Sequence, residues 1–185
     1  MFTLSLQRNT IGEDLTLLVE RIANPGNAQK RSVSGAIRQG FQDNFTTQGA
    51  ASGERWQPLA QRTVASRRKL GWGATGPILV RRGVLRDTWV NAGGQGHVSN
   101  VRQSAGMTIF EEGAEGEIPV IHELGAVIDI PAMQQSRKNG MMHVGGARQV
   151  TIPARPVSLL GERSEARIMD VIDFMISQIE REVMR

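Results

Sequence analysis

Residues 52–73 read SGERWQPLAQRTVASRRKLGWG, and this stretch joins a glycine-flanked loop to a run of basic residues. The loop carries Trp56 and Pro58, and a Trp in such a place is typically a packing anchor or an interface residue. Pro58 suits the first position of a helix, because proline lacks the amide hydrogen that would find no partner there. The stretch therefore predicts a basic helix from Pro58 to about Leu70, entered from a loop that holds Trp56.

The charge of the chain is divided between two successive segments. Residues 55–86 hold eight Lys and Arg residues and no Asp or Glu, whereas residues 87–129 hold seven acidic residues and only Arg102 as a base. Two such segments can meet within one molecule, between neighbouring copies, or with a polyanion.

The composition limits the class of protein. The chain has 185 residues, which is enough for one domain, and we expect that domain to span residues 1–185. The absence of Cys excludes a disulfide scaffold and thiolate sites. Because aromatic residues make up only 4% of the chain, we expect a core built mainly from Leu, Ile, Val and Met. No apolar run approaches the ~20 residues of a membrane helix and no signal peptide pattern is present, so we expect the protein to be made and used in a cytoplasm, or to be exported only by lysis.

Hydrophobic periodicity predicts helices in the first half of the chain. One helix is expected over residues 11–22, ended by the sequence NPGN at 24–27. A second runs from about residue 28 to near Gly49, with a narrow apolar stripe. A third is expected from Pro77 to Val90, where Gly83 would permit a close backbone contact.

Strand patterns dominate the second half. The predicted strands are residues 2–7, 97–103, 107–111, 127–131 and 148–153. Residues 117–125 favour one or two helical turns closed by Gly125. Residues 162–185 form the clearest helix, whose apolar stripe consists of Ile168, Val171, Ile172, Met175, Ile179 and Val183. Helices, then strands, then a helix indicate an α+β fold with an antiparallel sheet. We expect the closing helix to pack across that sheet.

The segment 127–153 is predicted to form an extended β-hairpin arm. Its turn would be Asn139-Gly140, because both positions of the favoured two-residue turn need positive φ. The predicted pairs are Lys138 with Met141, Asp129 with Val150, and Val127 with Ile152. Gly145-Gly146 would let one strand bulge or bend. A disordered surface loop is the alternative.

The tip of the arm is rich in methionine. Met133, Met141 and Met142 suit an adaptable apolar contact with a neighbouring subunit. We expect the base of the arm to belong to the domain sheet and its tip to reach that neighbour.

Catalytic and cofactor patterns are weak. His122 and Glu123 are adjacent on a helical turn, so their side chains point apart and do not form a dyad. The three His residues lack metal-ligand spacing, and neither GGQG nor GWGATG matches a phosphate-binding loop. We therefore expect no enzyme activity, no cofactor and no metal, with a small hydrolase using His122 as a remote alternative.

The basic segment 55–86 allows two readings. A solvated helix face is the simpler one, and nucleic-acid binding is the more specific one, since several phosphate contacts are available. Aromatic residues for base stacking are sparse apart from Trp56 and Trp72, and no known nucleic-acid-recognition motif is present. A stand-alone DNA-binding module therefore remains the alternative function.

Four motifs carry a family resemblance. GERWQPLAQRTVASR, ILVRRGVLRDTW, IPVIHELGAV and VTIPARPVSLLG precede the closing helix in the order seen in the phage virion morphogenesis family, the tail completion proteins of Mu-like and related tailed phages. The resemblance covers about residues 28–183. It rests on Trp56, Pro58, Leu59, Leu79, Gly83, Leu85, His122, Gly125, Pro153, Ala154, Arg155 and Pro156. The chain departs from the pattern at EIPV before His122 and at VSLL after Pro156, which are core or contact positions.

The resemblance implies a non-enzymatic virion protein that completes the tail and allows head–tail joining. Such proteins act at the neck as sixfold rings, between the tail terminator or tail tube and the head connector, with DNA passing through the ring. The implied interface residues are Trp56, Pro58, Leu59, Arg62, Arg67, Arg68, Lys69, Arg81 and Arg82, with Met133, Met141 and Met142 of the arm. The implied structural residues are Gly83, Leu85, His122, Gly125, Pro153, Arg155 and Pro156. In a ring, the basic segment 55–86 and the acidic segment 87–129 would meet between adjacent copies.

Overall fold

The computed structural model describes residues 11–72, 76–131, 133–138 and 141–183, and for residues 133–138 and 141–145 it describes only the backbone. The helices are α1 (Ile11–Ala23), α2 (Asn27–Thr47), a short 3-10 helix η1 (Ala50–Ser52), α3 (Gln61–Lys69), α4 (Val84–Val90), α5 (Glu117–Leu124) and α6 (Glu162–Val183). The strands are β1 (His97–Ser104), β2 (Met107–Ala114), β3 (Ala126–Ile130), β4 (Met133–Lys138), β5 (Met141–Gly145) and β6 (Arg148–Ile152). The predicted α+β class is confirmed.

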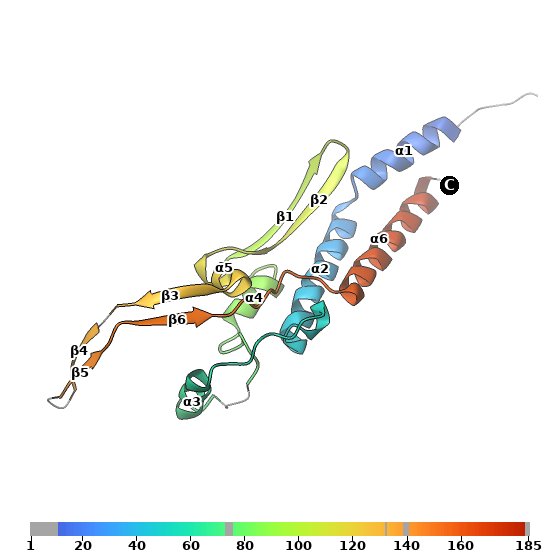
Figure 1. Cartoon of the computed structure of the whole chain (residues 1–185). Helices are drawn as coiled ribbons and strands as arrows, with labels where there is room; N and C mark the ends of the chain where they lie inside the picture. The colour runs from blue at the N-terminus through green and yellow to red at the C-terminus, as the bar shows by residue number, and fades with distance from the viewer. Residues whose placement is uncertain (1–10, 73–75, 132, 139–140, 184–185) are drawn as a thin grey trace, which may run out of the picture.

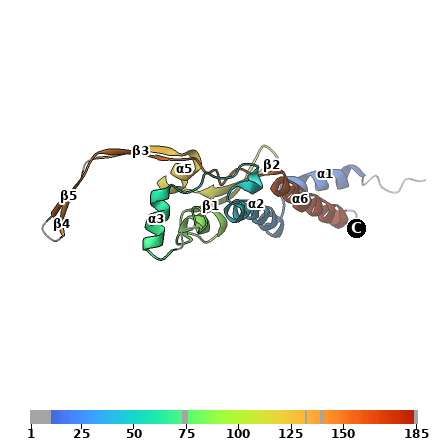
Figure 2. The same cartoon turned by 60° about the horizontal axis from the view of Figure 1, so that its bottom comes forward.

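The molecule is elongated. Helices α1 and α6 lie at one end, and strands β4 and β5 lie at the other (Figure 1). A second view, turned by 60°, shows the same separation of the two ends (Figure 2). The predicted strand at residues 2–7 lies outside the described residues. Within the part of the chain that is described, none of the helices combines the length and the apolarity needed to cross a bilayer.

The closing helix α6 packs against helices rather than strands, so its predicted partner was wrong. Its buried residues Met175 and Ile179 belong to the predicted stripe, and the helix contacts α1 and α2 along its length. Two close approaches set this arrangement. A Cβ on Gly161 would overlap the carbonyl of Ala51, and a Cβ on Gly40 would lie 2.5 Å from Leu160 Cδ2 and 3.2 Å from Ser164 Cβ. The chain therefore enters α6 beside the end of α2, and α6 continues along the helices.

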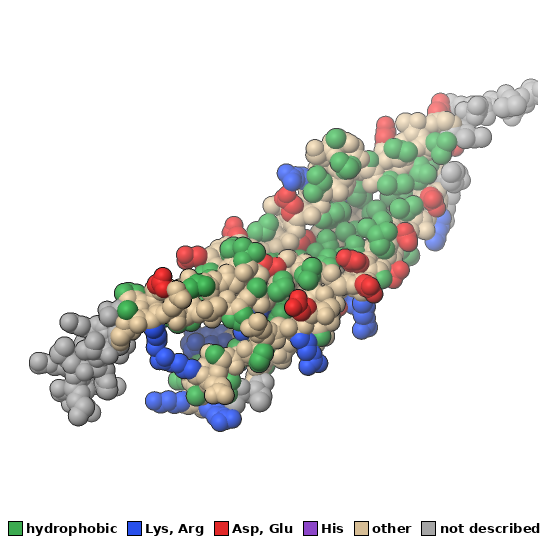
Figure 3. Space-filling view, in the orientation of Figure 1, with side chains coloured by type: hydrophobic (Ala, Val, Ile, Leu, Met, Phe, Trp, Pro, Cys, Tyr) green, Lys and Arg blue, Asp and Glu red, His purple; other side chains and the backbone are tan. Residues whose placement is uncertain are grey.

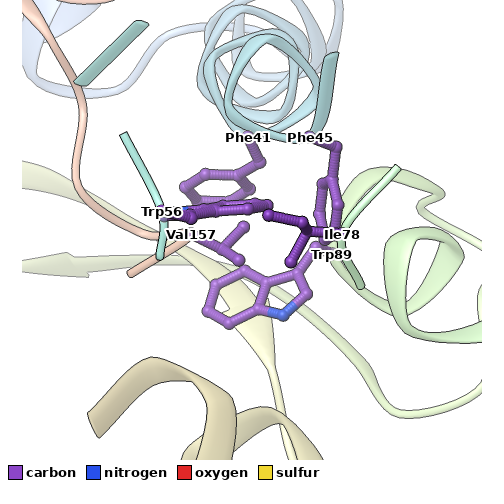
Figure 4. Packing of buried hydrophobic residues seen from close by; sticks show 6 residues of the cluster. All are labelled: Phe41, Phe45, Trp56, Ile78, Trp89 and Val157. Atoms are coloured by element: carbon purple, nitrogen blue, oxygen red, sulfur yellow. The ribbon is translucent and has the colours of Figure 1, made fainter. Parts of the chain in front are cut away.

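The core is centred on aromatic side chains. Figure 4 shows Phe41, Phe45, Trp56, Ile78, Trp89 and Val157 packed together below α2. Phe41 meets Trp89 edge to face with ring centroids 5.3 Å apart, and Phe45 meets Trp56 in the same manner at 5.7 Å. Four of the eight Phe and Trp residues thus form this core. By number the core is mainly aliphatic, as expected, since six of the ten buried hydrophobic residues and all the partly buried ones packed against the cluster are aliphatic. The four rings nevertheless form its centre, because each indole or phenyl ring buries far more area than its share of the composition indicates.

The strands form three separate two-stranded ribbons among the described residues, instead of the single predicted sheet. β1 and β2 form an antiparallel hairpin that lies against α2 and α4. Its turn is Ala105-Gly106, with φ of 50° and 76°, so both turn positions have the positive φ of a favoured two-residue turn. β3 pairs with β6 and β4 pairs with β5, and these two ribbons follow one another along the arm (Figure 1).

The arm has the predicted hairpin pairing but a different register at its base. Lys138 lies opposite Met141 as predicted, and the turn residues Asn139-Gly140 lie outside the described residues. At the base, however, Asp129 faces Gln149 and Val127 faces Thr151. The register shifts by one residue between Gln135 and Lys138, not at Gly145-Gly146. A single unpaired residue in one strand accounts for the shift, and such a slip exchanges the side chains on the two faces.

Two predicted helices begin later than expected. The basic helix α3 starts at Gln61, and Pro58 lies in the extended segment before it. The helix expected from Pro77 is reduced to α4, which starts at Val84. Gly83 is the residue before α4 and has φ 81°, a conformation that favours glycine. Gly83 is therefore required by its backbone angle, not by the close contact that the sequence suggested, since a Cβ there would make only ordinary contacts.

Candidate functional site

The Trp56 loop is fixed in the interior of the chain. Trp56 is 5% exposed, its Nε1 donates a hydrogen bond to the carbonyl of Pro156 at 3.2 Å, and its backbone amide donates to the carbonyl of Gln48 at 2.8 Å. Leu59 packs at the edge of the same core, whereas Pro58 is exposed. Of the two places considered for Trp56, the core and a neighbouring subunit, the structure shows the core.

Arg155 connects the segment around Pro156 to α5 and to the Trp56 loop. Its backbone amide donates to the carbonyl of His122 at 2.7 Å, and its guanidinium Nε and Nη2 donate to the carbonyl of Gln57 at 3.4 and 3.3 Å. Burial lowers the pKa of Arg155. Burial, and secondly the positive charge of Arg155, lower the pKa of His122 from its usual 6.5. His122 thus has a structural environment that favours its neutral form.

Glu123 has a role that the sequence did not indicate. Its carboxylate accepts hydrogen bonds from the backbone amides of Val157 at 2.7 Å and Ser158 at 3.2 Å, and also from the Ser158 hydroxyl. These hydrogen bonds order the turn after Pro156, and the carboxylate of Glu123 is directed at the backbone amides of that turn. No spacing in the sequence could have revealed it, because the partners lie 34 and 35 residues away.

Asn44 is a second residue that the sequence reading missed. It is 1% exposed, and its Nδ2 donates to the carbonyls of Val157 at 2.9 Å and Leu159 at 2.7 Å. The helical spacing could have indicated its burial, since Asn44 lies three residues after Phe41 and directly before Phe45, on the buried face of α2.

Gly125 completes this cluster of contacts. It has φ 75°, and a Cβ there would lie 2.8 Å from the amide nitrogen of Ala154 and 3.0 Å from the carbonyl oxygen of Ile152. Residues 153–159 are thus the point where the motifs around Trp56, His122 and Gly125 meet. Pro153 and Pro156 are both partly buried there, and Leu85 of α4 packs on the adjacent core. We name residues 153–159 the junction segment.

The basic segment separates into internal and surface residues. Arg67 is 8% exposed and its Nη1 donates to the carbonyls of Gly76 at 3.1 Å and Pro77 at 3.2 Å, so it holds the loop after α3. Arg86 is partly buried and the other six are exposed, and Arg81 lies over the ring of Trp72 at 3.6 Å from its centroid. We call five of the exposed residues the α3 basic cluster: Arg62, Arg68, Lys69, Arg81 and Arg82. Figure 3 shows Lys and Arg side chains gathered around α3. No member has an ion-pair partner among the described residues.

The acidic segment is partly neutralised inside the chain. Glu112 is fully buried, with Oε2 2.9 Å from Arg38 Nη1 and 3.2 Å from His97 Nε2. The Nδ1 of His97 lies 2.8 Å from the carbonyl oxygen of Thr88, which can only accept, so Nδ1 carries a hydrogen. Where side chains are described, the basic and acidic segments form one ion pair with each other, Arg86 with the adjacent Asp87 at 3.0 Å. Their predicted contact between adjacent copies remains a prediction.

The remaining predicted residues have no described side-chain contacts. Met133, Met141 and Met142 lie on β4 and β5, where only the backbone is described. The described residues hold no group of three His, Asp or Glu side chains placed to bind a metal ion.

Comparison with known proteins gives one positive result. The sequence profile of the phage virion morphogenesis family matches residues 7–177, which include α2, the Trp56 loop, α5 and the junction segment. No curated protein sequence and no solved structure gave a significant match. Since the match covers most of the chain, the protein belongs to the phage virion morphogenesis family, and its role lies in the assembly of a phage virion.

Proposed function

We propose that this protein is a structural component of the head–tail neck of a tailed phage, where copies form a ring that completes the tail and allows the head to join. The proposed ring is a homo-oligomer, with six copies as the expected number. Its neighbours are the tail terminator or tail tube on one side and the head connector on the other, and DNA passes through its centre. The role is structural and needs no enzymatic activity or cofactor.

The observation that carries this proposal is the β3–β6 ribbon. Within the described residues its two strands pair only with each other, and the ribbon extends away from the helices (Figure 1). Val127 is 59% exposed and Ile128 is 37% exposed. An isolated two-stranded ribbon is marginal in water, and open strand edges with apolar residues favour association. In an assembly, neighbouring subunits would cover both the open strand edges and these exposed apolar side chains.

The α3 basic cluster supports the same proposal. It leaves five positive charges on one region of the surface without ion-pair partners among the described residues. In a ring this cluster would face acidic protein surface or the DNA in the channel, and opposite charges would orient the subunits as they meet.

Loss of the gene in the phage tests the neck role. We expect filled heads and separate tails to accumulate, and the wild-type protein supplied in trans to restore joined particles. Electron micrographs should then place the chain between head and tail. Joined, infectious particles that form without this protein would overturn the proposal.

Charge reversal tests the contribution of the basic cluster. Arg68→Glu with Lys69→Glu should reduce joining, because two exposed charges of the cluster change sign. Arg31→Glu with Arg163→Glu is the matched control, since both residues are exposed and lie on α2 and α6, away from α3. Equal effects of the two double variants would show that the cluster has no specific role.

A second candidate function, a stand-alone DNA-binding module, is favoured by the same unpaired cluster beside Trp72. It requires the isolated chain to bind duplex DNA with an affinity that falls steeply with salt. The two double variants distinguish the candidates. A stand-alone module would lose DNA affinity in Arg68→Glu with Lys69→Glu while head–tail joining stayed normal.

A further inference from the structure

A groove lies between α1 and α6 at the end of the molecule opposite the arm. Its volume is about 550 Å³, and it is lined by residues of α1, of the turn before α2 and of α6. Leu17 and Ile179 supply apolar lining, and Glu20 and Glu182 supply two carboxylates. The exposed ion pair of Arg21 with Glu182, at 3.4 Å, connects the two helices across it.

The two helices that form the groove also expose apolar side chains, of which Leu17 lines the groove itself. On α1, Leu15 is 50%, Leu17 41% and Val19 65% exposed, and on α6 Met169 is 54% and Phe174 59% exposed. Figure 3 shows hydrophobic side chains gathered over α1 and α6 in this view. Apolar patches that are rimmed by charged residues mark sites of association.

The groove is lined by two carboxylates, Glu20 and Glu182, and one base, Arg21, and both helices carry more acidic than basic residues. Helix α1 carries Glu13, Asp14 and Glu20 against the single base Arg21. The second half of α6 carries Asp173, Glu180 and Glu182 against Arg181. An occupant should therefore combine apolar side chains with positive charge.

The arm of this chain has that combination. Its base exposes Val127 and Ile128, and Arg148 at the start of β6 is exposed. Its sequence adds Arg137 and Lys138, so residues 126–152 hold three basic residues and one acidic residue, Asp129. The methionines of β4 and β5 contribute adaptable apolar side chains.

The arm and the groove cannot meet within one molecule, because they lie at opposite ends of it (Figures 1 and 2). A contact between two different surfaces of identical copies is heterologous, and a heterologous contact that closes on itself generates a ring. We propose that the groove between α1 and α6 binds the β-hairpin arm, residues 126–152, of a neighbouring copy. This inference rests on the proposed ring and names the two surfaces that build it.

Cysteine cross-linking in assembled particles tests the contact, since the chain has no native Cys. One phage variant carries Leu17→Cys in the groove together with Ile128→Cys in the arm. Because a link between them must join two copies, we expect covalent multimers after mild oxidation. The matched control replaces Leu17→Cys by Val84→Cys, which is exposed but lies on α4, and each single Cys variant is a further control.

A charge exchange provides the second measurement and does not depend on a cross-link forming. Arg137→Glu with Lys138→Glu in the arm, or Glu20→Lys with Glu182→Lys in the groove, should each reduce the yield of joined particles. All four changes in one chain should restore it, because arm and groove are again of opposite charge. The arm–groove contact would be overturned if the variant with all four changes gave no higher yield of joined particles than the less productive of the two double variants.

The outcomes separate the inference from the proposed function. Joined particles with the chain at the neck, but with no multimers from the Leu17 and Ile128 pair beyond those of the Val84 control, would overturn the inference alone. Another neck protein cross-linked at position 17 would do the same and would name a different occupant. Multimers from that pair in a phage that joins heads and tails without this protein would instead overturn the neck role.

Discussion

The side chain of Asn44 donates a hydrogen bond to the backbone carbonyl of Val157, 113 residues further along the chain. It joins the last turn of helix α2 to the junction segment, and a second bond from the same nitrogen reaches Leu159. The amide therefore fixes how the chain turns into α6.

Replacement of Asn44 by Asp tests this link. The variant has nearly the same shape but offers acceptors where two carbonyls need a donor, so we expect a loss of about 2–4 kcal/mol in the free energy of unfolding. Chemical denaturation measures it. Gln39→Glu, on the exposed side of the same helix, makes the same chemical change and should cost no more than about 0.5 kcal/mol. Equal losses in both variants would contradict the structural role of Asn44.

Gly49→Ala tests the close packing of the backbone at residue 49 against the side chain of Trp56. Gly49 has φ 86°, and a Cβ there would lie 2.6 Å from Trp56 Cδ1 and 2.5 Å from the carbonyl oxygen of Glu54. Gly53 has φ 93° but open space around the same position, so Gly53→Ala introduces only the backbone strain. We expect Gly53→Ala to cost about 1–2 kcal/mol and Gly49→Ala clearly more. Thermal unfolding compares the two, and a Gly53 variant as unstable as the Gly49 variant would argue against the close contact.

Glu123→Gln tests the carboxylate that orders the junction segment. An amide has one acceptor oxygen where the carboxylate has two, so at least one donor from Val157 or Ser158 loses its partner. We expect a loss of about 1–3 kcal/mol. Glu117→Gln, at the exposed start of the same helix, is the control and should be close to neutral. If Glu123→Gln unfolds with the same midpoint as that control, the three hydrogen bonds contribute nothing measurable.

The lowered pKa of His122 predicts the pH dependence of stability. The folded protein binds the proton less readily than the unfolded chain, whose His has a pKa near 6.5. Above pH 6.5 His122 is neutral in both states and has no effect. Stability should therefore decrease as the pH falls below 6.5, and this loss should be complete once the pH is below the folded pKa.

His122→Asn isolates that contribution. It should remove part of the stability loss between pH 6.5 and acid while keeping the backbone carbonyl that accepts from Arg155. The difference in free energy of unfolding between wild type and variant, plotted against pH, is the measurement. A difference that stays constant across this range would show that His122 titrates alike in both states.

The local elements could be predicted from the amino-acid sequence alone. Periodicity and the NPGN break placed α1, α2 and α6, the alternation of apolar and polar residues placed β1 and β2, and the Asn139-Gly140 signal placed the pairing of Lys138 with Met141. These features depend on the conformational preferences of residues close in the chain, and such preferences can be read from a single sequence. The motifs around Trp56, His122 and Arg155 also identified the family.

The way these elements pack together could not be predicted in this manner, because it depends on contacts between distant parts of the chain. An apolar stripe shows which face of α6 is buried but not whether helices or strands cover it, and the small residues Gly40 and Gly161 decided for the helices. In the same way, one extra residue between Gln135 and Lys138 changed every pair at the base of the arm. Arg67 became an internal donor because the loop after α3 returns over it. In each case the contact joins backbone groups or small residues that are not neighbours in the sequence. Whether such groups come together depends on the path of the whole chain, which the conformational preferences of neighbouring residues do not specify.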